Sequence, residues 1–364
     1  MAATSTSDID IDIDMNINDF VQTQGNGVKG LADIGIKALP KQYIHPPEKR
    51  LDMNKVLNKG QDDHFIPVID MSSSDRSTVE RLICEAAKTW GFFQVINHGV
   101  PLEVMEDIQA AAYRFFELPV EEKRAFLKAI SPSEFVKYGT SFVPHFERCL
   151  EWKDYLSMTF VSEDEARSVW PIACRNEALE YLKSTSDIIS QIFEILMRGL
   201  NVNEIENKKS RLANSKALNL NFYPKCPEPE LTVGVGPHSD VQTFTVLLQD
   251  DVGGLYVRGP DGESWVNIPP IKGALIFNIG DTLQILSNGI YKSAEHRVVA
   301  NASNCRVSIP IFVGPSFQET IYPFPEVLEE GEKPKYKDIV YLDYVKHFLS
   351  NGHEGKVTID FVKA

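Results

Sequence analysis

Residues 254–268 read GLYVRGPDGESWVNI, and this stretch gives the clearest indication of the fold. Two strand-like runs, 254–257 and 264–268, flank Pro260-Asp261-Gly262, a combination typical of a tight turn between antiparallel strands. A second turn signal, Asn288-Gly289, predicts another hairpin. Further strand-like runs in this half of the chain are Leu218–Tyr223, Phe244–Leu248, Ala274–Ile279 and Arg306–Phe312. Many short strands separated by turns predict a sandwich or barrel.

The first half of the chain has a different pattern. Apolar residues at Val79, Leu82, Ile83 and Ala86 follow the spacing of one buried helix face. Short strands are expected at Ile66–Asp70 and Phe92–Ile96, and helices at Leu102–Leu118 and at Asn176–Leu200. The sequence therefore predicts a mixed α/β protein with a mainly β core. We expect a double-stranded β-helix, or jelly-roll, at residues 206–364 with a C-terminal helix, preceded by a helical region at 64–205.

Residues 1–63 are expected to form an acidic, partly disordered arm and lead-in. Residues 8–14 read DIDIDID, which could pair as a strand, but four like charges favour a solvated arm. The formal net charge of −14 argues against nucleic acid or an anionic membrane as a partner. No apolar run approaches a membrane span, and the N-terminus does not resemble a signal peptide. Five widely spaced cysteines indicate reduced thiols. We expect a cytoplasmic monomer.

Pro237-His238-Ser239-Asp240 is the strongest site signal. In an extended strand, side chains at i and i+2 share a face, so His238 and Asp240 can reach one metal together. The triplet alone is common and also fits a surface loop. His296, inside Ser293-Ala294-Glu295-His296-Arg297-Val298, supplies a third ligand, although it could also be a structural histidine at a strand end. Two histidines and one carboxylate form the facial triad of non-haem iron(II) oxygenases, with three positions left open.

Arg306 and Ser308 add a second element to this site. They are also spaced i and i+2, so both side chains point to one side of a strand. Arg306 offers a planar fork of donors suited to a carboxylate, and Ser308 adds a hydroxyl donor. A lone R-x-S is common, but this pair follows the third candidate ligand by ten residues in a β-rich region. The pair can hold the distal carboxylate of 2-oxoglutarate while its keto acid end binds iron.

The chain resembles plant 2-oxoglutarate-dependent dioxygenases, in the group that contains flavonoid and coumarin-pathway hydroxylases. The resemblance covers residues from about 64 to 345 and includes the triplet and Arg306-Val307-Ser308. Its other motifs are IPVID at 66–70, WGFFQVINHGV at 90–100, NFYPKCP at 221–227, LLQDDVGGL at 247–255, NIGD at 278–281 and SNG at 287–289.

This resemblance implies Fe(II) as the metal, 2-oxoglutarate as co-substrate, O2 as the oxidant and ascorbate as the reductant. By the family pattern, Asn221 and Tyr223 are further 2-oxo acid contacts, although ordinary strand packing would also explain them. His98 is structural in this pattern, and residues 151–155 (EWKDY) are scaffold. The implied reaction converts 2-oxoglutarate to succinate and carbon dioxide and oxidises a second substrate.

The loop at Thr140–Arg148 resembles that of the hydroxycinnamoyl-CoA ortho-hydroxylases, which act on feruloyl-CoA or p-coumaroyl-CoA in routes to scopoletin and umbelliferone. Which thioester is preferred stays open. Candidate substrate contacts are Phe142, His145, Phe312 and Asn219, with Phe146 in the same loop. His145 could also be an exposed loop residue and Phe312 a core residue. The CoA phosphates would need cations, and Lys137, Arg148 and Lys153 lie near this loop in the sequence.

Three alternatives remain at this point. Flavonoid oxidases of the anthocyanidin type carry Lys two residues before the Asn-x-Tyr pair, where this chain has Asn219, which weakens a flavonoid substrate without excluding it. A zinc hydrolase could use the same three ligands but has no use for Arg306 and Ser308. A non-catalytic jelly-roll binding protein would not need an intact triad.

Overall fold

The computed structural model describes residues 16–57, 66–141, 148–353 and 355–364. The acidic run at 8–14 lies outside these residues, as do Phe142, His145 and Phe146. Within the described ranges, no helix is long and apolar enough to cross a membrane.

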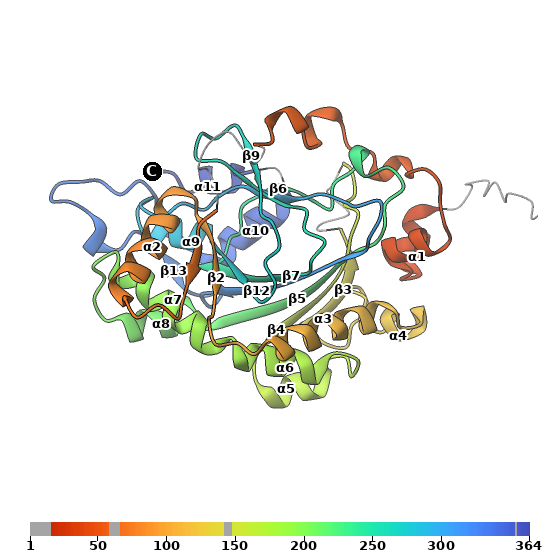
Figure 1. The fold of residues 1–364 in the computed structure, drawn as a ribbon, viewed down its shortest axis with the longest axis horizontal. Coiled ribbons are helices and arrows are strands. Elements are labelled where there is room, and N and C mark those ends of the chain that lie inside the picture. Colours follow the sequence, from red (N-terminus) through yellow and green to blue (C-terminus); the bar gives the residue numbers. More distant parts are fainter. Residues whose placement is uncertain (1–15, 58–65, 142–147, 354) are drawn as a thin grey trace, which may run out of the picture.

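Two β-sheets form the centre of the molecule (Figure 1). The larger sheet has eight strands, in the spatial order β1 (Val68–Asp70), β2 (Phe92–Ile96), β10 (Leu275–Ile279), β7 (Phe244–Gln249), β12 (Arg306–Gly314), β5 (Ser215–Tyr223), β4 (Asp154–Phe160) and β3 (Val136–Thr140). The smaller sheet has the order β6 (Val235–His238), β11 (His296–Val298), β8 (Leu255–Arg258) and β9 (Trp265–Asn267). A third pairing joins β13 (Thr320–Ile321) to β14 (Ile339–Val340). The two larger sheets give the predicted jelly-roll.

The larger sheet has one face toward the helices and one toward the smaller sheet. Along β12, Val307, Ile309 and Ile311 are fully buried in the main hydrophobic core. The alternate residues, from Arg306 to Phe312, line a cavity between the sheets. This division follows from the alternation of side chains along a strand. The larger sheet combines β1 to β4, from residues 64–205, with β5, β7, β10 and β12, from residues 206–364. The sheet therefore crosses the boundary predicted between the two regions.

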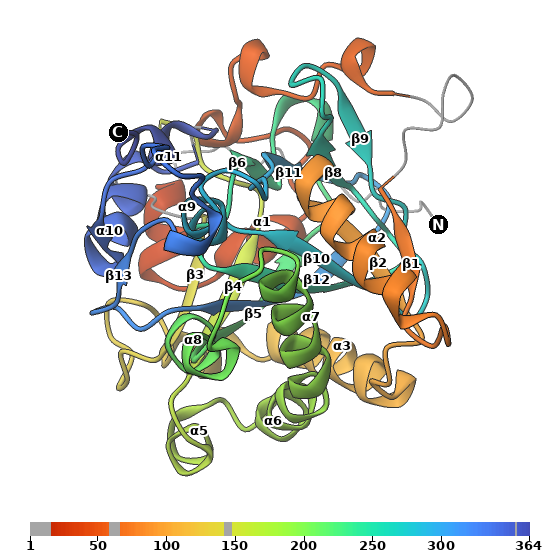
Figure 2. The ribbon, with the colours of Figure 1, turned by 90° about the vertical axis from the view of Figure 1, so that its left-hand side faces the viewer.

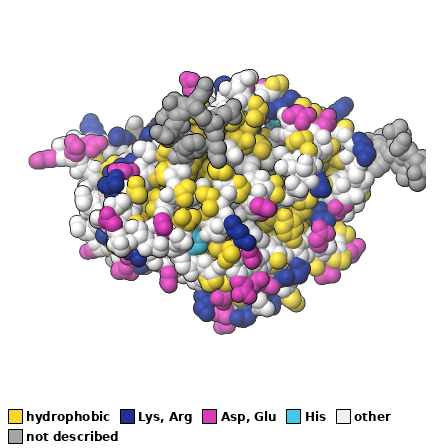
Figure 3. Space-filling model, viewed as in Figure 1, with side chains coloured by type: hydrophobic (Ala, Val, Ile, Leu, Met, Phe, Trp, Pro, Cys, Tyr) yellow, Lys and Arg dark blue, Asp and Glu magenta, His cyan; other side chains and the backbone are white. Residues whose placement is uncertain are grey.

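Helices cover the outer face of the larger sheet, as Figure 2 shows for α3, α6 and α7. The helices are α1 (Gly27–Asp33), α2 (Arg76–Thr89), α3 (Leu102–Phe116), α4 (Val120–Arg124), α5 (Glu163–Val169), α6 (Arg175–Ser184), α7 (Ser186–Arg198), α8 (Ile205–Leu212), α9 (Asp281–Leu286), α10 (Tyr341–Asn351) and α11 (Val357–Asp360). Short turns of other helix types are η1 (Asp19–Thr23), η2 (Lys41–Tyr43), η3 (Pro47–Lys49), η4 (Met53–Lys55), η5 (Pro229–Leu231) and η6 (Pro325–Val327). On the face in Figure 3, basic and acidic side chains are interspersed around hydrophobic ones.

Two of the predicted elements were wrong. The long helix predicted at 176–200 is two helices, α6 and α7, that meet at Thr185. The buried Thr185 hydroxyl donates to the carbonyls of Tyr181 (2.8 Å) and Leu182 (3.2 Å), a back-bonding arrangement that bends helices. Asn288-Gly289 does not form a hairpin but follows α9. Both residues have positive φ (51° and 83°), the conformation that commonly ends a helix.

The other turn prediction was confirmed, because β8 and β9 pair as a hairpin across Pro260-Asp261-Gly262. The Asp261 carboxylate accepts hydrogen bonds from the backbone N–H groups of Glu263 (3.0 Å) and Ser264 (3.1 Å). These bonds fix the turn that the sequence predicted.

Asp154 joins the lead-in to the larger sheet. Its carboxylate accepts hydrogen bonds from the backbone N–H groups of Val28 (2.7 Å) and Lys29 (2.8 Å), at the start of α1. The side chain is fully buried, and burial raises the pKa of Asp154 to about 6, although these two hydrogen bonds oppose the shift. The N-terminal segment is thus anchored at the β3–β4 edge of the sheet.

We predict that Asp154→Ala lowers the free energy of unfolding by about 1–3 kcal/mol, because two N–H groups lose their acceptor. A carboxyl whose pKa is raised on folding stabilises the folded state most below its unfolded pKa of about 4. This stabilisation is lost as the pH rises through the folded pKa of about 6. The deficit in urea unfolding should therefore be larger at pH 5 than at pH 7. Asp75→Ala, which removes the exposed cap of α2, is the control. If Asp154→Ala lowers the free energy of unfolding equally at pH 5 and pH 7, Asp154 does not have this role.

Candidate metal centre and its cavity

A cavity of about 280 Å³ lies between the two sheets. Residues from β5, β7 and β12 line one side and residues from β6, β8 and β11 line the other. His238, Asp240 and His296 all face this cavity.

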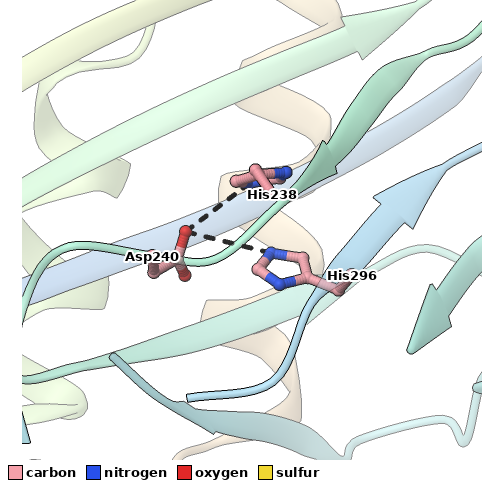
Figure 4. Close-up of side chains that lie close together, drawn as sticks. All are labelled: His238, Asp240 and His296. Atoms are coloured by element: carbon pink, nitrogen blue, oxygen red, sulfur yellow. Dashed lines mark ion pairs between the residues drawn. The ribbon is translucent and has the colours of Figure 1, made fainter. Parts of the chain in front are cut away.

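The ligand atoms of these three residues lie within 4.8 Å of one another. Asp240 Oδ1 lies 3.6 Å from His238 Nε2 and 3.8 Å from His296 Nε2, and Figure 4 shows the three side chains converging. His238 and His296 are opposite each other in the pairing of β6 with β11. Among the described residues, this is the group of histidine, cysteine and acidic side chains that could hold a metal ion.

Asp240 reaches the site differently from the prediction. Strand β6 ends at His238, so strand alternation does not position Asp240. Instead, its backbone carbonyl accepts a hydrogen bond from the N–H of Asp281 (2.7 Å). Its Oδ2 accepts hydrogen bonds from Thr245 Oγ1 (2.5 Å) and Asn278 Nδ2 (2.7 Å). These contacts hold one carboxylate oxygen and leave Oδ1 directed at the two imidazoles.

Backbone carbonyls orient both histidines. His238 Nδ1 lies 2.9 Å from the carbonyl oxygen of Gly236, and His296 Nδ1 lies 3.3 Å from that of Ala294. A ring nitrogen facing a carbonyl must carry the proton, so in the neutral ring Nε2 holds the free lone pair. Both Nε2 atoms are therefore available to a metal, as in metal sites where an outer partner fixes the tautomer.

The charges of the site suit a cation. Burial would raise the pKa of Asp240, but His296, His238 and the hydrogen bond from Thr245 outweigh it and hold the pKa well below its usual range. Burial and the neighbouring His238 lower the pKa of His296 to about 4, although Asp240 opposes this shift. At neutral pH the site offers one carboxylate and a neutral His296, the forms that bind a metal.

Arg306 lies on β12 in the same cavity and is 1% exposed. Its Nη2 lies 3.3 Å from Gln249 Oε1, whereas Nε and Nη1 are buried with no hydrogen-bond partner among the described residues. A buried guanidinium with two unsatisfied donors is costly unless an anion binds it. Its surroundings therefore fit a carboxylate of a bound co-substrate.

The strand register brings the other three predicted co-substrate residues to Arg306. Ser308 is paired with Asn221 and Arg306 with Tyr223, in the antiparallel pairing of β12 with β5. Asn221 Nδ2 lies 3.5 Å from Ser308 Oγ, and the Arg306 guanidinium lies 5.0 Å from the centre of the Tyr223 ring. All of these side chains line the cavity.

The predicted substrate residues are only partly described. Asn219 and Phe312 line the cavity, and Asn219 Oδ1 is buried with no described partner. Phe142 and His145 lie outside the described residues. Lys153, predicted near the mouth, is instead buried in the cavity wall and forms an ion pair with Glu151 (3.1 Å). His98, predicted to be structural, bonds to the carbonyl oxygen of Gly273 (2.9 Å) and does not line the cavity.

No sequence pattern indicated that the C-terminal segment takes part in this site. His353 and Phe348 line the cavity, and the His353 ring stacks on the His238 ring with centroids 4.2 Å apart. Glu151 holds this segment, because its Oε1 lies 2.6 Å from His353 Nδ1 and accepts a hydrogen bond from the N–H of Gly236 (2.8 Å). Thr245 and Asn278 were also missed, although Asn278 belongs to one of the motifs quoted above.

We predict that Thr245→Val weakens metal binding roughly 10- to 100-fold, as is typical when an outer hydrogen bond to a ligating carboxylate is lost. The valine has the same shape but no hydroxyl, whereas Thr245→Ser keeps the hydroxyl and should bind nearly as wild type. Titration of the apoprotein with Co(II), followed by visible absorbance, measures both. Equal affinity in the valine and serine variants would show that the Thr245 hydroxyl does not support Asp240.

Comparison with known proteins agrees with this geometry. Residues 214–315 match the model of the 2OG-Fe(II) oxygenase superfamily, and residues 66–180 match that of the non-haem dioxygenase in morphine synthesis N-terminal region. A crystal structure of JOX2 in complex with 2OG, Fe and JA has a TM-score of 0.80 and 33% identity, covering 93% of this chain and 97% of that one. A rice dioxygenase for auxin oxidation shares the fold, with a TM-score of 0.70, 23% identity and coverage of 82% of this chain and 100% of that one.

Two plant hydroxylases are similar to this chain along most of its length. Feruloyl CoA ortho-hydroxylase 1 of Arabidopsis thaliana is 55% identical over 95% of this chain and 96% of its own length. The bi-functional coumaroyl CoA and feruloyl CoA ortho-hydroxylase Diox4 of Ruta graveolens is 52% identical over 95% of this chain and 94% of its own. With its jelly-roll, its two-histidine, one-carboxylate cluster and these relatives, the chain belongs to the 2OG-Fe(II) oxygenase superfamily.

Proposed function

We propose that this 2-oxoglutarate-dependent Fe(II) dioxygenase hydroxylates the aromatic ring of feruloyl-CoA, p-coumaroyl-CoA or both, ortho to the side chain. The new hydroxyl can close a lactone and expel CoA, which gives scopoletin or umbelliferone. The observation that carries the proposal is the similarity to ortho-hydroxylases of these two thioesters, at 52–58% identity over 95% of the chain. The same similarity favours these substrates over flavonoids.

We propose roles for the cavity residues in this reaction. His238, Asp240 and His296 bind Fe(II) through the two Nε2 atoms and Oδ1, which the geometry above supports. Arg306 and Ser308 bind the distal carboxylate of 2-oxoglutarate, with Asn221 and Tyr223 beside them. Bound iron, with O2 and 2-oxoglutarate, supplies the oxidant, while 2-oxoglutarate becomes succinate and carbon dioxide.

The remaining cavity wall suits an aromatic substrate. Phe312 and Leu247 offer apolar surface near the cluster, and Asn219 offers an unsatisfied amide oxygen that can accept a phenolic hydrogen bond. Phe142 and His145 are proposed as further contacts on the loop resemblance alone. Ascorbate as reductant, a monomeric state and a cytoplasmic location complete the proposal.

The first test concerns the co-substrate anchor. Arg306→Ala should raise the apparent KM for 2-oxoglutarate at least about 30-fold, because loss of a buried charged partner typically costs ~2–5 kcal/mol. Arg306→Lys should recover only part of the affinity, since an ammonium cannot form the planar fork. Succinate release measures the effect, and Arg258→Ala, which removes an arginine of the smaller sheet paired with Glu295, is the control. An unchanged KM in Arg306→Ala would assign the anchor to another cation.

The second test concerns the aromatic substrate. With Fe(II) and 2-oxoglutarate, feruloyl-CoA or p-coumaroyl-CoA should gain one oxygen by mass, whereas the free acids and flavonoids should react poorly. Remote contacts to CoA can orient the ring, so a truncated substrate should lose turnover as well as affinity. Asp240→Ala should abolish the product and serves as the control. Comparable efficiency on free ferulate, or a preference for a flavanone, would refute the thioester assignment.

A further inference from the structure

A CoA thioester is too large for the cavity at the metal centre. At about 280 Å³, this cavity lies at the lower limit of pockets that enclose one small ligand, and it must hold 2-oxoglutarate as well as the aromatic ring. The nucleotide end of CoA must therefore lie elsewhere on the protein. This inference rests on the proposed function, since it applies only if the substrate is a CoA thioester.

A second and larger cavity, of about 510 Å³, lies at the β3 edge of the larger sheet. We call it the edge cavity; its lining is Val21, Gln22, Thr23, Gly27, Arg124, Leu127, Lys128, Ala129, Ile130, Tyr138, Gly139, Thr140 and Tyr155. One wall is the lead-in segment with η1 and α1, which contact β3, and another is the segment that follows α4. Figure 1 shows α1, α4 and β3 at the same end of the molecule.

The strand register connects the edge cavity with the metal centre. Asn221 of β5, which lines the metal cavity, is paired with Tyr155 of β4, and Tyr155 is paired with Gly139 of β3. Tyr155 and Gly139 both line the edge cavity. Paired residues share a face of the sheet, and β5 and β3 are two strand spacings apart, roughly 10 Å. The pantetheine arm of CoA is long enough to cross this distance.

The edge cavity has the charge that phosphates require. Arg124 and Lys128 are exposed, and neither forms an ion pair with an acidic residue in the described part of the chain. The described lining contains no Asp or Glu. In a chain with a net charge of −14, two exposed cations in a hollow whose described lining has no carboxylate provide a local site for an anion.

Two other hollows in the described structure do not offer this combination. In one, Lys208 is paired with Glu326 (2.8 Å) and Arg211 with Glu319. In the other, between α5 and α6, Arg167 is paired with Glu163 (2.6 Å), and Glu163 and Glu180 share the lining with Lys183 and Lys216. Cations that share a hollow with carboxylates attract a phosphate less strongly.

We propose that the edge cavity binds the nucleotide end of the CoA thioester. Arg124 and Lys128 bind phosphate oxygens, and the exposed apolar surface of Ile130 and Ala129 receives the adenine. The pantetheine arm runs over β4 past Tyr155 to the metal cavity. The lead-in segment, which supplies Val21 to Thr23, is then part of the substrate site.

The first experiment removes the cations. Isothermal titration calorimetry with CoA itself, without an acyl group, should show that Arg124→Ala/Lys128→Ala binds roughly 5- to 20-fold more weakly than wild type. The control is Lys88→Ala/Lys183→Ala, which changes the net charge equally at two exposed lysines outside both cavities and should bind CoA as wild type. Equal binding by wild type and the Arg124/Lys128 variant would overturn the proposal.

The second experiment separates the nucleotide from the ring. The Arg124→Ala/Lys128→Ala protein should lose a similar factor in kcat/KM for feruloyl-CoA, but none for feruloyl-N-acetylcysteamine, a thioester without phosphates. Loss on both thioesters would show a general defect and overturn the proposal. If the wild type hydroxylates neither, the proposed function fails, whereas calorimetry with CoA still decides the nucleotide site.

A single exposed residue gives a test with a matched control. Ile130 lines the edge cavity and is 58% exposed, so substitutions there should not disturb the core. Ile130→Glu places an anion beside the two cations and should weaken CoA binding, increasingly so at low salt, whereas Ile130→Gln has the same size without the charge. If the glutamate and glutamine variants bind CoA equally at low salt, phosphates do not lie in this cavity.

Discussion

The pairing of β12 with β5 and β7 is the interaction on which the rest of the structure depends. It places Ser308 beside Asn221 and Arg306 beside Tyr223 on one face. On the other face, Val307 and Ile309 pack into the main core with the helices. Because side chains alternate along a strand, a slip of one residue would send Arg306 into the apolar core and valine into the cavity. The hydrophobic core thus fixes the register of the site.

The site contains two buried charged side chains that differ in their hydrogen bonding. Asp240 is satisfied, because Thr245 and Asn278 bond to one of its oxygens and leave the other toward the histidines. Arg306 is not satisfied within the described residues, since two of its nitrogens have no partner. The Asp240 cluster is arranged for a cation and Arg306 for an anion. One cavity can therefore hold a metal ion and a dicarboxylate that chelates the metal at one end and binds Arg306 at the other.

Segments distant in sequence complete the walls of both cavities. His353 stacks on His238 and is held by Glu151, so the C-terminal segment and the residues just before β4 meet at a histidine of the candidate metal centre. At the first residue of β4, Asp154 binds the backbone of α1 and holds the lead-in beside the edge cavity. Both contacts involve buried carboxylates of the same short motif, residues 151–155, which serves as scaffold for two parts of the site.

The sequence by itself determined β5, β7, β8, β9, β10 and β12, the hairpin at Pro260-Asp261-Gly262 and the set of candidate ligands, because periodicity, turn chemistry and ligand spacing are local properties. The predictions of one helix through Thr185 and of a hairpin at Asn288-Gly289 were wrong. At both places the same residue preferences suit two structures, and packing decides between them. Only the tertiary structure showed what holds Asp240, where His353 lies, that Lys153 is buried and that a second cavity exists. These features depend on contacts between residues far apart in the chain, such as the 202 positions that separate Glu151 from His353. No local pattern encodes such contacts, because they arise only when the sheets close around the site.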